Sequence, residues 1–369
     1  MKKHSTTDKS PKQERKACRG PITIGVDLGD KTSRYCMLDE QGAVLREGGF
    51  ATSKNGVTQQ FASLGRRRIA LEVGTHSPWI SRLLKSFGHE VIVANARQVK
   101  LISQSSRKDD RLDAQTLARL ARVDPQLLRP IRHRSQKAQE HLMRIRVRAS
   151  LVEARTRLVN AARGLTKAAG ERLASCDADT MNVGRLQALP AELQEILRPL
   201  IEQVESLTEK IHASDVTIEQ IARSEYPETE LLRQVSGVGN LIALTFILTL
   251  EDRERFQKSR DVGCYVGLRP KRSSSGDSEP QLGISKEGDI YLRKLLVQAA
   301  QHILGWRAPD TDLRRWGLKL SARGGKNAKK RAIVAVARKL AVLLHRLWVS
   351  GEVYEPLGYS QQAGRRAAA

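Results

Sequence analysis

The sequence predicts three successive regions: an α/β domain, a long helical insert and a mostly helical C-terminal domain. Up to about residue 120, short apolar runs rich in β-branched residues alternate with a helical pattern, which is typical of an α/β fold. Between Asp124 and Pro227 the chain continues in long Arg- and Leu-rich stretches with apolar residues three and four positions apart. From Leu231 onward, apolar helical segments are interrupted by glycine-rich turns.

The composition points to a nucleic-acid partner. The chain of 369 residues carries 64 Lys and Arg against 40 Asp and Glu, a formal net charge of +24. A chain of this length is expected to hold two or three domains, at roughly 150 residues each. The excess of positive charge predicts attraction to a polyanion, most naturally nucleic acid. Composition alone would also fit a ribosomal or chromatin protein.

The cysteines and the N-terminus predict a cytoplasmic protein. Cys18, Cys36, Cys176 and Cys264 lie far apart without a CxxC spacing, so neither a zinc ribbon nor a disulfide framework is expected. The N-terminal stretch is basic and polar, with no apolar segment behind it. No stretch reaches the ~18 uninterrupted apolar residues of a membrane span, so no membrane contact is expected.

The α/β domain is expected at residues 21–130, after a disordered basic arm at residues 1–20. Its predicted elements follow in order: a strand at 22–29, two strands within 35–50 joined by a turn at 40–42, a strand at 66–74, a helix at 77–88 and a strand at 89–96. This order places a hairpin directly after the first strand.

The helical insert is expected at residues 131–226. It contains two long helical patterns, at 138–165 and 192–222. In the second, apolar positions recur at steps of three and four residues with charged residues between them, as in a helical hairpin or a coiled coil. Two interpretations stay open: a spacer that packs on itself, or a device for dimerisation.

Four acids have a spacing that suits a shared metal ion. Asp27 and Glu72 each end a predicted strand, and Asp110 and Asp113 lie three residues apart at the start of a helix, so these two face one side. Such carboxylates can hold one or two Mg²⁺ ions that clamp a phosphodiester, and without a cation they would repel one another. Spacing also allows structural roles, with Asp109 as a helix N-cap and Glu72 paired to an arginine. Geometry does not choose between Asp109 and Asp110.

Four segments of the first half carry a family resemblance. In order they read GVDLGDKTSRYCMLDEQG, LEVGTHSPW, HEVIVANARQVKLI and KDDRLDAQTLARL. They resemble the N-terminal domain of the DEDD transposases of bacterial insertion sequences, a family related to the Piv-type DNA invertases. The resemblance implies a RuvC-like, RNase H-type fold for residues 21–130. The family pattern Lys-x-Asp-x-x-Asp-Ala fits Lys108 to Ala114, so the resemblance favours Asp110 over Asp109. It implies that the four matched acids bind Mg²⁺ or Mn²⁺.

The C-terminal domain, expected at residues 227–325, has two features suited to phosphate. VSGVGNLIALT places Gly237 and Gly239 before an apolar helix, as in a helix-hairpin-helix turn whose N–H groups meet phosphate. Further on, an SSSG loop lies between two groups of cations that could hold a scissile phosphate for attack by a hydroxyl. These cations are Arg269, Lys271 and Arg272 before the loop, and Lys286, Arg293 and Lys294 after it. An ordinary tight turn and a flexible basic loop are the alternatives.

The second half resembles the C-terminal transposase domain of the same family. The resemblance rests on GVG, ERF, YVGLRP, SSG, ISKEGD and YLRKLL, which follow in that order. It implies a nucleophilic serine in the Ser-Gly motif, which maps to Ser275, with Ser274 as the fallback in a row that begins at Ser273. A basic helix and tail at residues 326–369 end the chain.

The resemblance implies a transposase that cuts and rejoins donor and target DNA near the nucleoid. A phosphoserine link conserves bond energy for rejoining, in agreement with the absence of a GxxxxGK[ST] motif for ATP. In the family, dimers and tetramers assemble around a structured noncoding bridge RNA that selects both DNAs by base pairing. Two alternatives stay open: a RuvC-like junction nuclease without a covalent intermediate, and a non-catalytic RNA or DNA chaperone with structural acids.

Overall fold

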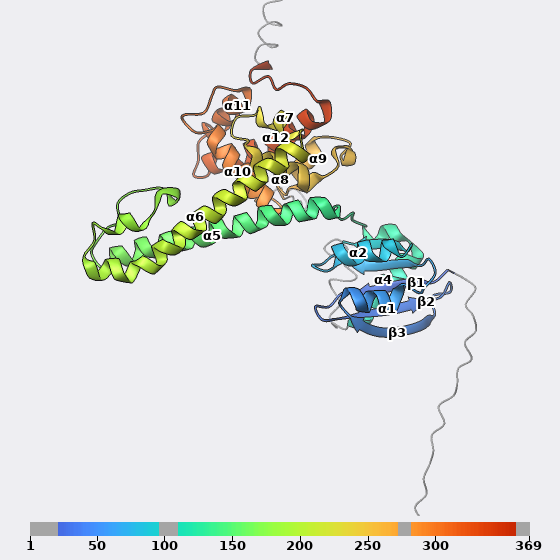
Figure 1. The fold of residues 1–369 in the computed structure, drawn as a ribbon. Coiled ribbons are helices and arrows are strands. Elements are labelled where there is room, and N and C mark those ends of the chain that lie inside the picture. Colours follow the sequence, from blue (N-terminus) through green and yellow to red (C-terminus); the bar gives the residue numbers. More distant parts are fainter. Residues whose placement is uncertain (1–20, 96–109, 272–281, 359–369) are drawn as a thin grey trace, which may run out of the picture. The chain divides into compact units, whose positions relative to one another are not determined.

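The chain divides into two compact units, Met1–Arg134 and Ser135–Ala369, and each has its own hydrophobic core (Figure 1). The computed structural model describes residues 21–95, 110–271 and 282–358, and only the backbone of Asp110 and Arg111. The predicted arm at residues 1–20 lies outside the described residues, as does the end of the tail.

The first unit is built on a five-stranded mixed sheet. Its strands are β1 (Thr23–Asp27), β2 (Thr32–Leu38), β3 (Val44–Ala51), β4 (Arg68–Glu72) and β5 (Glu90–Ala94), in the spatial order β3-β2-β1-β4-β5. β2 is antiparallel to both β1 and β3, whereas β1, β4 and β5 run parallel. The C-terminal ends of the three parallel strands therefore meet at one edge of the sheet.

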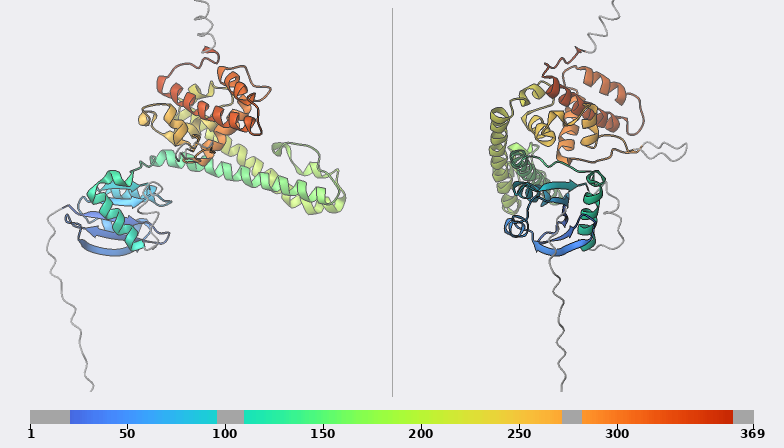
Figure 2. Two further views of the ribbon diagram at one scale, coloured as in Figure 1. Left: turned by 180° about the vertical axis from the view of Figure 1, so that it is seen from behind. Right: turned by 90° about the vertical axis from the view of Figure 1, so that its right-hand side faces the viewer.

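Helices cover both faces of this sheet. α1 (Lys54–Phe61) and α2 (Ser77–Ser86) pack on one face, and α4 (Asp110–Val123) packs on the other (Figure 2). Side chains alternate along a strand, which decides what each helix meets. The residues facing α1 and α2 are large and apolar and form the main core: Ile24, Val26, Ile69 and Leu71.

The mixed sheet confirms the α/β character expected for the N-terminal region. α1 has no counterpart in the sequence pattern, because only Val57 and Phe61 of its eight residues are buried. The signal for this helix lies at its start. The Ser53 hydroxyl accepts a hydrogen bond from the Gly56 N–H at 3.1 Å, a typical N-cap contact.

The second unit begins with two long paired helices, α5 (Gln136–Ala168) and α6 (Ala191–Glu225). Apolar residues near the start of α5 pack with the end of α6, and those near the end of α5 pack with the start of α6. The two helices therefore form an antiparallel hairpin. Among the described residues, the short 3-10 helices are η1 (Pro125–Leu128), η2 (Ala178–Thr180), η3 (Val183–Leu186) and η4 (Arg253–Arg255).

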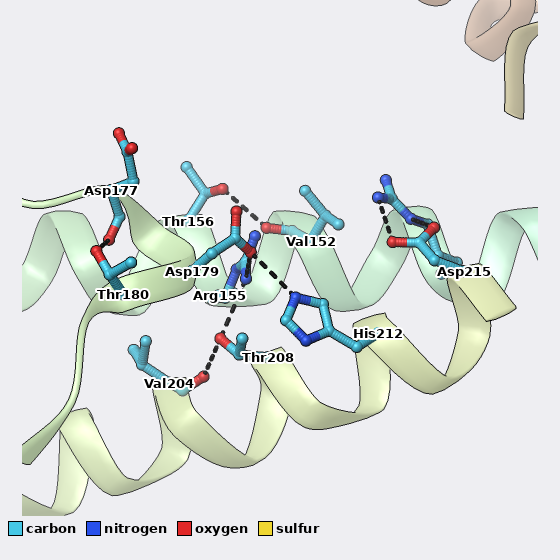
Figure 3. A network of polar contacts seen from close by, with 11 residues as sticks. Val152, Arg155, Thr156, Asp177, Asp179, Thr180, Val204, Thr208, His212 and Asp215 are labelled. Atoms are coloured by element: carbon cyan, nitrogen blue, oxygen red, sulfur yellow. Dashed lines mark hydrogen bonds and ion pairs between the residues drawn. The ribbon is translucent and has the colours of Figure 1, made fainter. Parts of the chain in front are cut away.

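A buried arginine fixes the register of this hairpin (Figure 3). Arg155 of α5 is only 7% exposed, and its guanidinium donates to Asp179 Oδ1 at 2.5 Å and to Thr208 Oγ1 of α6 at 3.1 Å. Further along, Arg148 donates two hydrogen bonds to Asp215 at 2.8 and 3.0 Å. A shifted pairing would leave a buried guanidinium without acceptors, so this network selects one register.

The rest of the second unit is a helical bundle around one core. Its helices are α7 (Thr229–Arg233), α8 (Asn240–Leu250), α9 (Arg260–Tyr265), α10 (Ile290–Ile303), α11 (Asp312–Ser321) and α12 (Ala328–Ser350). The second unit is thus mostly helical, as expected. Within the described residues, no helix is both long and apolar enough to cross a membrane.

Candidate active site

Two of the predicted acids end neighbouring strands. Asp27 is the last residue of β1 and Glu72 is the last residue of β4. The strands are parallel, with Val26 paired to Leu71, so the next residue on each strand lies at the same level. Gly25 and Ala70, which lie two residues before Asp27 and Glu72, face α4. Because side chains alternate along a strand, the two carboxylates project towards the same helix.

Gly25 allows α4 to approach the sheet closely. A Cβ atom on Gly25 would lie 1.9 Å from the carbonyl oxygen of Ala114 and 2.5 Å from the backbone nitrogen of Ala118. No side chain fits in that space. The contact therefore holds the first turns of α4 against β1, and Asp113 precedes one of the two contacting residues.

The direction of α4 places its acidic end at the acidic edge of the sheet. Arg68, at the start of β4, donates from Nη1 to the carbonyl oxygen of Ala121, late in α4, at 3.3 Å. Ala114, early in α4, lies against Gly25, near the end of β1. α4 therefore runs antiparallel to the two strands, and its first turn lies beside the strand ends that carry Asp27 and Glu72.

The electrostatics of Glu72 indicate that Asp113 lies near it. Burial raises the pKa of Glu72 above its usual range, and the negative charge of Asp113 raises it further. Repulsion of this kind requires a short separation in a partly buried setting. Carboxylate oxygens are the ligands preferred by Mg²⁺ and Mn²⁺, and a divalent cation would remove the repulsion, so these residues fit such an ion.

The other predicted ligand is placed only through its backbone. Asp110 is the first residue of α4, one turn before Asp113, and both its side chain and all of Asp109 lie outside the described residues. Among the described side chains, no group of three metal-ligating residues is assembled. The structure thus brings Asp27, Glu72 and Asp113 to one edge of the sheet without forming a closed coordination shell.

A polar contact joins the two loops that follow these acids. His76 Nε2 lies 3.6 Å from Asp30 Oδ1, and Trp79 Nε1 donates to His76 Nδ1 at 3.2 Å. The tryptophan bond makes Nδ1 an acceptor, so a neutral His76 carries its proton on Nε2, towards Asp30. The sequence pattern did not predict this pair, although His76 follows Glu72 by only four residues.

A buried serine ties the loop after Glu72 to the end of the first unit. Ser77 Oγ donates to the Gly74 carbonyl at 2.8 Å and accepts from the Gly74 N–H at 3.0 Å. The same oxygen lies 2.9 Å from His133 Nε2. Since its single proton goes to Gly74, the hydroxyl accepts from His133, and burial together with nearby cations lowers the pKa of His133 to about 4.

The second candidate site is a hairpin that carries the SSSG loop. Three backbone hydrogen bonds join its legs: Lys271 N to Gly283 O at 2.9 Å, Ser285 N to Arg269 O at 2.9 Å and Lys286 N to Gly267 O at 3.1 Å. Pro270 and Ile284 form an antiparallel bridge between them. Arg272 and the three serines, Ser273, Ser274 and Ser275, lie outside the described residues, in the segment that connects the legs.

Two glycines let the base of this hairpin close. Gly267 has φ +73°, and a Cβ there would lie 2.1 Å from the carbonyl oxygen of Glu287. Gly288 has φ +72°, and a Cβ there would lie 2.0 Å from the carbonyl oxygen of Tyr265. Left-handed backbone and this close approach both require glycine, which explains the glycines of YVGLRP and ISKEGD.

The predicted cations around the hairpin differ in their surroundings. Arg269, Lys271 and Lys286 are exposed on its legs, with Arg269 Nη2 at 3.8 Å from Glu287 Oε2. These side chains are available to a phosphate, since solvent-exposed ion pairs of this length are weak.

The two cations of α10 make contacts within the unit. Arg293 Nη1 donates to the carbonyl oxygens of Val266 at 3.0 Å and Glu287 at 2.7 Å, so it braces the base of the hairpin. Lys294 Nζ lies 3.2 Å from Glu153 Oε1 of α5, and both side chains are largely exposed.

The predicted glycine turn lies between α7 and α8. Gly237 has φ +83°, and a Cβ there would lie 3.1 Å from His302 Cδ2 on α10, so the turn packs against that helix. Gly239 caps the N-terminus of α8 and is exposed, with open space where a Cβ would be. Gly239 therefore places the start of α8 at an exposed turn.

A mixed sheet with acids at one edge, in a chain of net charge +24, is typical of an enzyme that processes nucleic acid. Residues 24–169 match the family model of the DEDD type described as "Transposase", and residues 229–314 match the model "Transposase IS116/IS110/IS902 family". The chain belongs to the IS110 family of insertion-sequence transposases and is a DNA transposase, as its sequence motifs predicted.

Curated relatives are similar over three quarters or more of the chain. The transposase for insertion sequence element IS1111A of Coxiella burnetii is 28% identical over 351 residues, 93% of this chain and 94% of that protein. A probable family 20 transposase of Pseudomonas aeruginosa is 28% identical over 341 residues, 90% and 98% of the two chains. The transposase for IS1328 of Yersinia enterocolitica is 27% identical over 285 residues, 75% and 82% of the two chains.

Proposed function

We propose that this transposase cuts and rejoins DNA through a serine–phosphodiester intermediate, assisted by a divalent metal ion at Asp27, Glu72, Asp110 and Asp113. The observation that carries the proposal is the repulsion between Glu72 and Asp113 at the sheet edge where Asp27 also lies. Carboxylates that lie close together despite their mutual repulsion are typical of a site that binds a cation during the reaction.

The metal is proposed to be Mg²⁺ or Mn²⁺. When bound, it would neutralise negative charge on the reacting phosphate. The protein's own contribution is the placement of the carboxylates: Asp27 and Glu72 are held by adjacent strands, and Asp113 by a helix that Gly25 keeps against the sheet. Ligands on rigid elements need little reorganisation when a cation binds.

The proposed nucleophile is Ser275, with Ser274 as the alternative. Its hydroxyl loses a proton as its oxygen bonds to phosphorus, and the bridging oxygen of one DNA strand leaves and takes up a proton. Attack by a strand hydroxyl then reverses the chemistry and rejoins the DNA without ATP. The closed hairpin base and the exposed Arg269, Lys271 and Lys286 support this role, because they would hold a phosphate near the loop.

The domain scheme follows from the same proposal. Residues 21–130 form a RuvC-like domain, a proposal supported by the strand order β3-β2-β1-β4-β5 with α4 across one face. Residues 131–226 form the helical insert, 227–325 the transposase domain with the serine, and 326–369 the basic helix and tail. The glycine turn at Gly237 and Gly239 would add a backbone contact to phosphate.

A structured bridge RNA and assembly into dimers or tetramers complete the proposal. The net charge of +24 supports binding of RNA as well as DNA, with phosphate contacts giving affinity and base pairing giving selectivity. Exposed apolar residues along the helical hairpin of α5 and α6 support a contact between protomers: Met143 and Val147 on α5, and Val216 on α6.

A strand-exchange assay tests the proposal. Purified protein, the noncoding RNA transcribed from the DNA flanking the gene, and labelled donor and target DNA are combined with Mg²⁺. We expect Asp113→Asn and Ser275→Ala each to reduce exchange by about 100-fold or more while RNA binding persists. Full exchange by both Ser275→Ala and Ser274→Ala would overturn the serine mechanism. Metal-dependent cleavage without rejoining in these two variants would favour the junction nuclease that uses water. Full exchange by Asp113→Asn would overturn the metal site.

A further inference from the structure

One tryptophan of the C-terminal unit is almost fully exposed. Trp306, on the loop between α10 and α11, has 82% of its surface exposed. The other tryptophans, Trp79, Trp316 and Trp348, are buried or half-buried. An indole ring left in water loses the burial that stabilises most tryptophans, so such exposure is typical of binding surfaces.

A cation lies on this ring. The guanidinium carbon of Arg307 is 4.3 Å from the ring centroid of Trp306. A second pair of the same kind lies in the neighbouring helices, where Lys339 Nζ of α12 is 4.4 Å from the ring centroid of Trp316 of α11. Tryptophan combined with arginine is a common platform for a nucleobase, because both offer flat faces and the cation also attracts phosphate.

The loop is held against the two basic helices that follow it. A Cβ on Gly317 of α11 would lie 2.7 Å from Leu304 Cδ2 and 2.5 Å from Val336 Cγ2 of α12, so the end of α10, α11 and α12 meet at this glycine. Trp306 follows Leu304 by two residues. The exposed ring therefore belongs to the same surface region as α11 and α12, which Figure 1 shows packed together.

This region has a strong positive charge. Residues 306–339 contain eleven Lys and Arg but only two acids, Asp310 and Asp312. Asp310 is paired to Arg315 at 2.6 Å, so these two charges offset each other and the other cations remain in excess. Exposed cations concentrate between the two helices and at the start of α12, at Lys319, Arg323, Lys326, Lys329, Lys330 and Arg331. A polyanion suits this surface better than a protein partner of ordinary charge.

We infer that Trp306 and Arg307 form a stacking site for an unpaired nucleobase, with the cations of α11 and α12 holding the adjoining phosphates. The bases of a duplex are already stacked and expose no face, so the site selects single-stranded segments or splayed loops of RNA or DNA. The inference rests on the proposed function insofar as a guided transposase handles both a structured RNA and opened DNA strands.

The test compares binding of oligouridine, oligothymidine and a duplex of equal length by full-length protein. We expect Trp306→Ala to weaken single-strand binding on the order of tenfold, to leave duplex binding unchanged, and to leave the salt dependence of log Kd unchanged, because no phosphate contact is lost. Trp306→Phe should restore most of the affinity. Val123→Ala, which shortens an apolar side chain that is 67% exposed at the end of α4 in the first unit, serves as the matched control.

The outcomes separate the sources of the base. If Trp306→Ala weakens binding of oligouridine alone, RNA is the ligand. If it weakens binding of both oligouridine and oligothymidine, the site also takes opened DNA. Unchanged single-strand binding, or an equal loss for the duplex, overturns the inference. A change in oligomeric state by light scattering with unchanged binding would assign the ring to a protein contact instead. The serine chemistry is tested separately, by strand exchange with Ser275→Ala. A negative result in the binding test of Trp306 therefore does not affect that proposal.

Discussion

Gly25 of β1 and Ala114 of α4 are in backbone contact, so close that a Cβ on Gly25 would lie 1.9 Å from the Ala114 carbonyl oxygen. This contact sets the position of the helix that carries Asp113 relative to the strand that carries Asp27. The acidic edge therefore depends on a glycine that is not itself a ligand.

Gly25→Ala should separate α4 from the sheet. Backbone atoms cannot move aside as a flexible side chain can, so we expect the first unit to lose about 2–4 kcal/mol of unfolding free energy. Denaturant unfolding measures the loss. Gly65→Ala is the matched control, because the nearest atom to its Cβ would be Arg67 Nη1 at 4.0 Å. Equal stability of both variants would show that α4 is not held at this point.

Asp113→Asn should have opposite effects on stability with and without metal. A carboxylate with a raised folded-state pKa favours folding at low pH, and this contribution is lost as pH rises from the ordinary pKa through the raised one. Glu72 is such a group, partly because of Asp113. Removing that charge should raise Tm in chelator at neutral pH by about 1–3 °C.

The same substitution should abolish the Tm increase that Mg²⁺ or Mn²⁺ gives the native protein, because a ligand is lost. Glu40→Gln, which neutralises an exposed acid in the same unit, should retain it. A native Tm that does not respond to either metal at millimolar concentration would contradict a metal site at this edge.

His133 should make the first unit sensitive to mild acid. Its pKa is lowered to about 4 in the folded chain, against a usual value of 6.5. The unfolded chain binds the extra proton first, so stability falls as pH decreases from about 6.5 towards 4. His133→Gln keeps a donor for Ser77 Oγ without titrating, and should flatten the pH dependence of unfolding in this range. An unchanged pH profile would place the acid sensitivity elsewhere.

Gly267→Ala should displace the serine loop although it changes no residue of the loop. The new Cβ would lie 2.1 Å from the Glu287 carbonyl, in a backbone conformation with φ +73°. We expect strand exchange to fall by tenfold or more, since displacement of a reactive group by an ångström costs about that much or more. Gly283→Ala, on the opposite leg and with nothing within 4 Å, should remain active. Equal activity of both variants would separate the hairpin base from catalysis.

Local patterning was enough to predict the sheet. β1, β4 and β5 are short apolar runs, a pattern that is visible without any tertiary information. α1 could not be predicted in the same way, because its few buried residues give a weak pattern and pack against strands that are distant in the sequence.

The residues of the candidate site could be predicted from the sequence, whereas the contacts that position them could not. Asp27 and Glu72 are visible as strand ends, but their alignment depends on the parallel pairing of β1 with β4. The contact between Gly25 and Ala114 joins residues far apart in the chain, so no local pattern reports it. Arg293 looked like a phosphate ligand by composition, whereas its contacts to two backbone carbonyls appear only once the hairpin has folded.

The covalent intermediate is the most direct test of the proposed chemistry. Native protein, guide RNA and end-labelled donor DNA are incubated with Mg²⁺ and stopped in denaturant, and the label is followed on a denaturing protein gel. We predict labelled protein with the native chain and with Ser278→Ala, a change in the same loop, and no labelled protein with Ser275→Ala or with chelator. Labelled protein that persists in Ser275→Ala would contradict the assignment of this serine, and DNA cleavage by the native chain without any protein-linked label would contradict the serine mechanism as a whole.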